Sequence, residues 1–217
     1  MYFTSRIEAG YKLALELTSY RYENTVVVAL NDGGVQVGQQ IAAQLHCALT
    51  MLLIENIEVP GEGTSMGTLN QSGRFTYNGM LSAGEIEEYY TEFHSYLDDQ
   101  RRVGMGKMNQ LLGAGGIVRE DMLREQNVIL VADGLSNGAS LDAAVDFIKP
   151  LKIKRLIVAV PVAAVPAVDR MHLLADELHV LNVTDNYIDA NHYYDVNDVP
   201  SHEQTVAALN EIVLNWR

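Results

Sequence analysis

One segment, residues 128–148, limits what this chain can fold into more than any other. It begins with five apolar residues, reaches an acid at Asp133, passes through a loop with glycines at 134 and 138, and resumes a helical pattern at residues 141–148. A short apolar run bounded by turn residues is typical of a buried strand, so the segment predicts a strand, a tight loop and a helix start. The first N–H groups of a helix lack partners within the helix, and its dipole is positive there. The loop is therefore a candidate phosphate cradle.

The same alternation of strand and helix patterns runs through the rest of the chain. Apolar runs predict strands at residues 25–30, 48–54, 128–132, 156–160 and 178–181. Periodic apolar residues predict helices at residues 6–18, 35–45, 85–112, 141–148, 167–175 and 203–215. Strands that alternate with helices imply parallel pairs joined by right-handed crossovers. We therefore expect an α/β fold of three layers, with a mostly parallel central sheet flanked by helices.

A variable excursion from this pattern is expected at about residues 56–112. Its first half is rich in Gly, Ser, Thr and Asn. Short alternating pieces there predict antiparallel strands at residues 65–69 and 74–77. The polar helix at 85–112 is expected to break at Gly104 and Gly106 and to end at the glycine-rich residues 113–116.

Length and composition favour one domain that covers residues 1–217. The chain is 48% hydrophobic, which is enough to bury a sizeable core. Its single cysteine, Cys47, excludes an internal disulfide and is expected to be a small buried residue. The N-terminus has no basic segment followed by an apolar stretch, and no run has the roughly 18 apolar residues of a membrane span. These features predict a soluble, cytoplasmic protein.

The charge of the chain restricts its partners. Fifteen basic residues against 28 acidic ones give a formal net charge of −13 at pH 7. Such a field opposes binding to nucleic acids and to anionic membranes, so neither is expected as a partner. It would also repel a polyphosphate, unless the pocket is locally positive or a divalent metal accompanies the ligand.

The residues of the first segment resemble a known signature. Residues 128–140 are similar to the phosphoribosyl diphosphate (PRPP) signature of the type I phosphoribosyltransferases, which has four apolar residues, two acids, a short spacer and then Thr-Gly-x-Thr. Asp133, Gly138 and Ser140 keep this pattern, whereas Ala132 replaces the first acid and Asn137 the first Thr.

The resemblance covers nearly the whole chain and is closest to uncharacterised phosphoribosyltransferase-like proteins. Its further segments, in order, are residues 6–14, 25–34, 100–102, 158–162 and 193–195. Six segments in the same order at compatible spacing support a common fold, although activity depends on the site itself.

The resemblance assigns roles to the signature loop. It implies that Asp133 accepts hydrogen bonds from a ribose hydroxyl and is the candidate catalytic residue, whereas Ala132 can accept none. It further implies a cradle for the 5′-phosphate formed by Gly134, Ser136, Asn137, Gly138, Ala139 and Ser140. Asp142, in the first turn of the next helix, either lies near this anion or simply complements the helix dipole.

The resemblance also places a pyrophosphate loop after the first strand, at Asn31, Asp32, Gly33 and Gly34. Family members usually carry an Arg where this chain has Asp32, which reverses the local charge by two units. They also commonly carry a basic pair at the strand end formed here by residues 53–56, and this chain has none. At about 4 Å and an effective dielectric near 20, one charge pair is worth about 4 kcal/mol, so the exchange is a large perturbation.

Further candidates follow from the same resemblance. The cations that could replace the missing basic pair are Arg101, Arg102 and Lys107. The candidate contacts to a base are Val160, Pro161 and Tyr194. No protein side chain is expected to ligate a metal directly, because the six histidines show no metal-binding spacing.

Three functional hypotheses stay open at this point. The first is an enzyme that transfers the ribosyl 5-phosphate group of PRPP to a nitrogenous base, with Mg²⁺ on the pyrophosphate. The second is a catalytically degenerate binding or regulatory protein on the same fold, favoured by the three departures at Asp32, Ala132 and Asn137. The third is a structural homo-oligomer without a ligand. Hydrolase, P-loop and dinucleotide-binding motifs are absent from the sequence.

Overall fold

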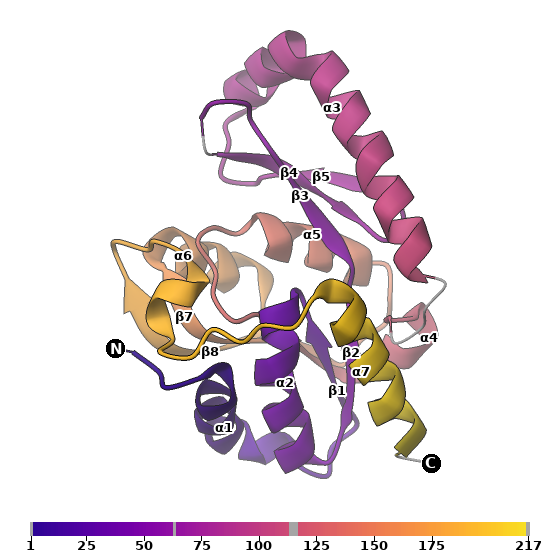
Figure 1. Ribbon diagram of the computed structural model, residues 1–217, viewed down its shortest axis with the longest axis vertical. Coiled ribbons are helices and arrows are strands. Elements are labelled where there is room, and N and C mark those ends of the chain that lie inside the picture. Colours follow the sequence, from indigo (N-terminus) through magenta and orange to yellow (C-terminus); the bar gives the residue numbers. More distant parts are fainter. Residues whose placement is uncertain (1, 63, 113–116, 216–217) are drawn as a thin grey trace.

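A computed structural model describes residues 2–62, 64–112 and 117–215, and its central element is a five-stranded sheet (Figure 1). Every neighbouring pair of strands in this sheet is parallel. The strand order is β2 (Ala48–Met51), β1 (Thr25–Ala29), β6 (Asn127–Val131), β7 (Arg155–Ala164) and β8 (Glu177–Thr184). The expected α/β fold with a mostly parallel sheet is confirmed.

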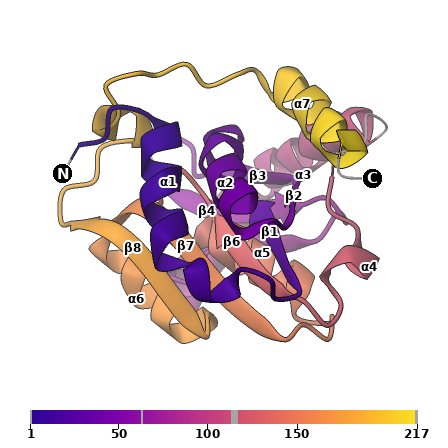
Figure 2. The ribbon, with the colours of Figure 1, turned by 90° about the horizontal axis from the view of Figure 1, so that it is seen from below.

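Helices cover both faces of the central sheet, as Figure 2 shows from below. One face carries α1 (Arg6–Glu16) and α2 (Asp32–Leu45); the other carries α5 (Ala139–Ile148) and α6 (Val165–Leu174). The C-terminal helix α7 (His202–Asn215) packs against β2 and α2. The protein therefore has the three layers that the sequence predicts.

Successive side chains along the central strands alternate between two hydrophobic clusters, one on each face of the sheet. Val27 and Ile129 belong to the cluster shared with α1 and α2, whereas Val28 and Leu130 belong to the cluster shared with α5. Successive side chains of a strand point to opposite faces, so uninterrupted apolar strands supply both cores. Cys47 lies in the first cluster, as expected, and burial raises the pKa of its thiol to about 12.

A smaller antiparallel sheet lies beside the carboxyl ends of the central strands, at the top of Figure 1. It has the order β3 (Ile54–Glu58), β4 (Ser65–Asn70), β5 (Phe75–Tyr77), and α3 (Ala83–Leu112) packs on it. The predicted antiparallel excursion is confirmed. The short elements of the chain are η1 (Thr18–Tyr20), α4 (Glu120–Leu123) and η2 (Ala190–Tyr193).

The expected break of α3 at Gly104 and Gly106 is wrong. The helix continues through both glycines, and its non-helical residue is Phe93. A glycine costs only about 1 kcal/mol in a helix interior, which packing can offset. A Cβ on Gly104 would lie 3.1 Å from Cδ2 of Leu69, so this glycine lets the helix approach β4 closely. The glycines at 113–116 lie outside the described residues.

Two boundaries differ from the sequence prediction in ways that bear on function. The apolar run 48–54 forms two strands in different sheets, because β2 ends at Met51 and β3 begins at Ile54. The Asn31–Gly34 segment is the first turn of α2 and not a separate turn. The side chain of Asn31 caps this helix by accepting a hydrogen bond from the Gly34 N–H at 2.6 Å.

Among the described residues, no helix combines the length and the apolar character needed to cross a bilayer.

The contact between α1 and α2 yields a stability prediction for Gly10→Ala. A Cβ on Gly10 would lie 2.5 Å from the carbonyl oxygen of Val37, so the two helices must separate. We expect a loss of about 1–3 kcal/mol in the free energy of unfolding, measured by urea denaturation. The matched control is Gly106→Ala on α3, where the added Cβ would have no neighbouring atom within 4 Å. This variant should gain up to about 1 kcal/mol in the free energy of unfolding. Equal stability of the two variants would contradict this packing.

Candidate functional site

The candidate site lies between β1 and β6, where the helices that connect the parallel strands change from one face of the central sheet to the other. From β1 the chain passes through α2 on one face to β2, and from its neighbour β6 it passes through α5 on the other face to β7. The loops that follow β1 and β6 therefore separate and leave a crevice at the carboxyl edge of the sheet. In open α/β sheets this switch point is where ligands bind.

A cavity of about 200 Å³ opens at this point. Its walls come from the ends of β1 and β6, from β3 above, and from the first turn of α5. The lining residues are Leu30, Asn31, Ile54, Asn56, Ala132, Gly134, Leu135, Ser136, Asn137, Ser140 and Tyr187. The structure thus brings the signature loop and the first residue of the predicted pyrophosphate loop to one cavity.

The start of α5 gives this cavity the character of an anion site. The Asn137 side chain accepts a hydrogen bond from the Ala139 N–H at 3.0 Å, which fixes the loop at the helix terminus. The Ser140 hydroxyl donates to Oδ1 of Asn56 at 3.4 Å, so it faces the small sheet across the cavity. The helix dipole and these polar groups favour a negatively charged ligand group.

Asp133 does not line the cavity, because its carboxylate is turned beneath the first turn of α2. Its Oδ2 accepts from Nε of Arg6 at 2.7 Å, and its Oδ1 accepts from Nδ2 of Asn31 at 2.8 Å. A Cβ on Gly33 would collide with Oδ2, so glycine is required for this close approach. Asp133 therefore joins the two predicted loops, and its contact with a ribose stays a prediction.

Arg6 is the partner that stabilises the buried carboxylate of Asp133. Both side chains are almost fully buried, at 2% and 4% residue exposure. The remaining guanidinium nitrogens of Arg6 donate to Asn191 at 2.6 Å and to Asn197 at 3.2 Å. Its Cζ lies 4.4 Å from the centre of the Tyr194 ring. A buried ion pair of this kind needs its other polar atoms satisfied, and these contacts satisfy them.

The predicted base contacts lie in the core or next to this ion pair. Val160 and Pro161 are buried on β7. The Tyr194 hydroxyl donates to the backbone carbonyl of Asp133 at 2.5 Å, and burial raises the pKa of this phenol. None of the three lines either of the described cavities. Their role in base binding stays a prediction.

Tyr187 is an aromatic side chain that reaches the smaller cavity, which Tyr194 does not. It lines the 200 Å³ cavity, and a Cβ on Gly134 would collide with its hydroxyl oxygen. Burial, together with the nearby charge of Asp133, raises the pKa of the Tyr187 phenol. The hydroxyl therefore keeps its proton and can donate a hydrogen bond to a ligand.

Asp142 forms an ion pair, so its role is more than to complement the helix dipole. Oδ1 of Asp142 accepts from Nε of Arg170 at 2.7 Å and also from its Nη2, and Oδ2 accepts from the Gly79 N–H at 3.0 Å. The same arginine packs on Gly138, where a Cβ would collide with its Cγ. Glycine at 138 therefore makes room for Arg170 behind the loop.

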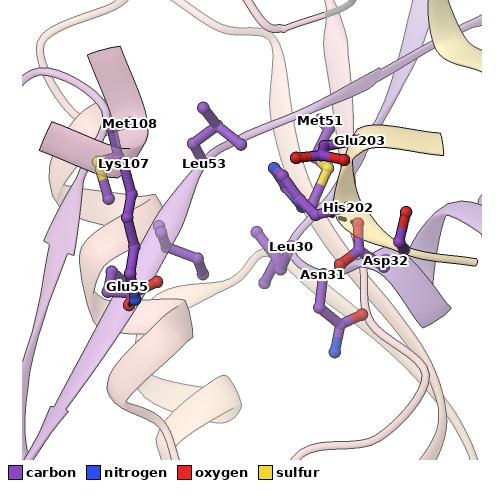
Figure 3. Close-up of a pocket in the computed structure, with 12 residues that line it drawn as sticks. Leu30, Asn31, Asp32, Met51, Leu53, Glu55, Lys107, Met108, His202 and Glu203 are labelled. Atoms are coloured by element: carbon purple, nitrogen blue, oxygen red, sulfur yellow. Dashed lines mark hydrogen bonds and ion pairs between the residues drawn. The ribbon is translucent and has the colours of Figure 1, made fainter. Parts of the chain in front are cut away.

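A larger cavity of about 570 Å³ adjoins the first one (Figure 3). Both cavities share Leu30, Asn31 and Ile54 in their walls. The remaining walls come from the start of α2, from β2 and β3, from the end of α3 and from the start of α7. The other lining residues are Asp32, Met51, Leu53, Glu55, Lys107, Met108, Ser201, His202 and Glu203.

A hydrogen-bonded pair and an ion pair face each other across the larger cavity in Figure 3. On one side, Oδ1 of Asp32 lies 2.8 Å from Nδ1 of His202. On the other, Nζ of Lys107 lies 2.7 Å from Oε1 of Glu55. Of the three candidate cations, only Lys107 lines this cavity. Arg101 packs over the ring of Phe75, and Arg102 pairs with Asp99, so the structure does not bring the three together.

Sequence reasoning missed three residues of the site: Arg6, Tyr187 and His202. A signal existed for Arg6, because it lies seven residues before Leu13 on the buried face of α1. A charged residue on an apolar face needs a buried partner. No comparable signal identifies Tyr187, which lies outside the helices and strands, or His202, whose partner Asp32 is 170 residues away.

The arrangement of the two sheets, with a phosphate-type loop at the switch point, defines the type I phosphoribosyltransferase fold. The family model of the phosphoribosyl transferase domain matches residues 6–201, and this chain belongs to that family. Function within the family still depends on the residues of each site.

Solved structures of other proteins share the fold of this chain. The crystal structure of TT1426 from Thermus thermophilus is similar over 100% of this chain and 99% of that chain, with a TM-score of 0.74 and 26% identity. A hypothetical protein from Neisseria gonorrhoeae with bound ppGpp is similar over 96% of each chain, with a TM-score of 0.51 and 13% identity, which shows the fold alone.

Curated relatives are considerably longer than this chain. Two Mycobacterium tuberculosis proteins, MT0597 and Rv0571c, are named provisionally as phosphoribosyl transferases and are 24% identical over 181 residues. The match covers 81% of this chain and 39% of each relative. The chain thus spans about two fifths of their length.

The Arg6–Asp133 ion pair leads to a second stability prediction. Arg6→Met leaves the carboxylate of Asp133 buried without its cation, which should cost about 3–5 kcal/mol of unfolding free energy. The matched control is Arg102→Met, whose ion pair with Asp99 is exposed and should contribute at most about 1 kcal/mol. Chemical denaturation at pH 7 measures both. If the two variants were equally stable, the buried pair would not anchor the site.

Proposed function

We propose that this protein binds a phosphorylated ribose, either PRPP or a nucleotide, with the 5′-phosphate on residues 136–140 at the start of α5. The observation that carries the proposal is the 200 Å³ cavity at the switch point, with a helix N-terminus in its wall. Ser136, Asn137 and Ser140 line this cavity and can donate hydrogen bonds to phosphate oxygens. The ribose would then lie towards Asn31 and Tyr187.

If the protein is an enzyme, the reaction is transfer of the ribosyl 5-phosphate group. A nitrogen of the acceptor base attacks C1 of PRPP, the bond from C1 to the pyrophosphate oxygen breaks, and the acceptor loses a proton. The helix N-terminus holds the 5′-phosphate while charge develops on the leaving group. C1 of the ribose would then lie at the boundary between the two cavities.

A pyrophosphate leaving group would need a cation in this site. Asp32, Glu55 and Glu203 bring negative charge to the larger cavity, and Lys107 is already paired with Glu55. Mg²⁺, bound through the pyrophosphate of PRPP and not by a protein side chain, would supply this charge neutralisation.

The alternative is a binding or regulatory protein without turnover. Ala132 stands at the cavity wall where the family carries its first ribose-binding acid, so one acceptor for the ribose hydroxyls is missing. Asp32 replaces a cation and is tied to His202. The loss at Ala132 weakens the binding of any ribose 5-phosphate, whereas Asp32 acts against PRPP and not against a nucleoside monophosphate, which has no pyrophosphate.

The phosphate site is tested by Ser140→Asp. An acid in the first turn of a helix complements the helix dipole, so the fold should be kept, but its charge repels a phosphate in the same place. We expect at least tenfold weaker binding of ribose 5-phosphate in calorimetric titration. The control is Ser82→Asp, which adds the same charge before α3 and lies outside both cavities. Unchanged affinity in Ser140→Asp would place the phosphate elsewhere.

A second titration separates the enzyme from the degenerate binding protein. Combining Ala132→Asp with Asp32→Arg adds a ribose acceptor and removes repulsion at the pyrophosphate. The double variant should gain about 1–3 kcal/mol in binding PRPP with Mg²⁺ from charged hydrogen bonds. Ribose 5-phosphate, which has no pyrophosphate, serves as the control ligand. If the unmodified protein binds PRPP as tightly as the double variant, its site is not degenerate.

A further inference from the structure

A row of apolar side chains runs along the outer surface of α1. Ile7, Tyr11 and Leu15 follow one another at intervals of four residues, which places them in one row on the helix. They are 50%, 48% and 54% exposed. The outward side of a surface helix normally carries charged and polar residues, so an exposed apolar row requires an explanation.

The row lies on the side of α1 that borders α2, and the two helices are neighbours in Figures 1 and 2. Gly10, three residues after Ile7, is in contact with α2, because a Cβ there would lie 3.0 Å from Cβ of Gln40. The other side of α1 is charged and faces β8, where Oε2 of Glu16 lies 3.3 Å from Nδ1 of His179. The apolar row is therefore continuous with the surface of α2.

That surface of α2 is uncharged. Among the 14 residues of α2, only Asp32, at its start, carries a charge. The segment before α7 crosses the helix at Gln36, whose Nε2 donates to the Asp198 carbonyl at 3.3 Å, whereas Ala43 and Gln44 near the end of the helix are exposed. The open surface of both helices, called the α1/α2 face below, is formed by Ile7, Tyr11, Leu15, Gln40, Ala43 and Gln44.

Tyr22 continues this face beyond the ends of the two helices. The residue is 84% exposed, and its ring stacks on His46, the C-cap of α2, with 6.3 Å between the ring centres. Its φ of 71° lies in the left-handed region, which bulky residues rarely adopt. Neither burial nor backbone preference accounts for a tyrosine at this position, whereas contact with a partner would.

The charge of the chain favours a second copy as that partner. With a formal net charge of −13, two copies repel each other wherever acidic surfaces meet. The α1/α2 face has no charged side chain, so two copies can approach there without this repulsion. The cores of protein interfaces are likewise depleted in charge and enriched in tyrosine.

The order of the residues in the row also suits a second copy. A two-fold axis at Tyr11 would place this side chain against the partner's Tyr11, and Ile7 against the partner's Leu15. The row would then be complementary to itself, as a two-fold symmetric interface requires. A different protein would have no reason to match this symmetry.

We propose that two copies of this chain associate through the α1/α2 face, with α1 antiparallel to the partner's α1 about a two-fold axis at Tyr11. The 11 residues of α1 and the 14 residues of α2 give lengths of roughly 16 and 21 Å, and two adjacent helices are roughly 20 Å wide. The projected face is on the order of 400 Å², and side-chain relief and Tyr22 enlarge it. This approaches the roughly 600 Å² per partner at the lower end of specific interfaces, so the dimer is reversible.

Analytical ultracentrifugation over a range of protein concentrations tests the association. At high concentration the chain should sediment with twice its mass of 24.0 kDa, and it should dissociate on dilution. A chain that stays monomeric at every concentration overturns the proposal, even if a different protein is found to bind this face.

Tyr11→Glu tests which surface is used, because it places two like charges at the axis. We expect the dimer to weaken about tenfold or more. The matched control is Val103→Glu, which changes a side chain that is 52% exposed on α3, outside the face, and should keep the dissociation constant within about twofold. Thermal unfolding shows that both variants are folded. A dimer that is equally tight in folded Tyr11→Glu contradicts the assignment.

Tyr11→Cys tests the two-fold axis independently. The native Cys47 is buried, and burial raises the pKa of its thiol to about 12, so it should not react. Facing Cα atoms of two packed helices lie roughly 4–6 Å apart, which a disulfide can span. With oxidised glutathione as the oxidant, we expect a covalent dimer of Tyr11→Cys and none of the control Val103→Cys. If Tyr11→Cys forms no cross-link, or Val103→Cys forms it equally well, the proposed axis is wrong. This experiment decides if Tyr11→Glu does not fold.

Discussion

The buried ion pair between Arg6 and Asp133 is the interaction on which the site depends. It connects the first helix to the end of β6, across 127 residues of sequence, and Asn31 completes it from the end of β1. Two charges removed from water are stable only with each other and with further hydrogen bonds. The pair therefore fixes how the loops after β1 and β6 face one another, and through Asn191 it also holds the segment before α7.

The two adjoining cavities differ in the charge of their walls. The α5 terminus keeps a cavity suited to a phosphate, whereas the adjoining cavity carries more acid than base. A ligand that is anionic at both ends, such as PRPP, would therefore need a cation in order to occupy both cavities.

The fold was predictable because its signals are local. Apolar periodicity located the strands and helices, and in the structure Ser5 caps the start of α1, where its side chain accepts from the Glu8 N–H. The errors came where tertiary contacts override local preference. Gly104 does not break α3 because it packs against β4, and the apolar run at 48–54 divides between two sheets. Neither outcome is encoded in the residues nearby.

The sequence by itself determined the order of the elements, the parallel sheet and the loop at the start of α5, since each follows from patterns within about twenty residues. Only the tertiary structure decided which side chains meet in the site. Asp133, expected at a ribose, pairs with Arg6, and Asp32 pairs with His202 from the other end of the chain. Periodicity records which face of an element is buried, but it does not record which distant residue packs there, and the charge of a site depends on that pairing.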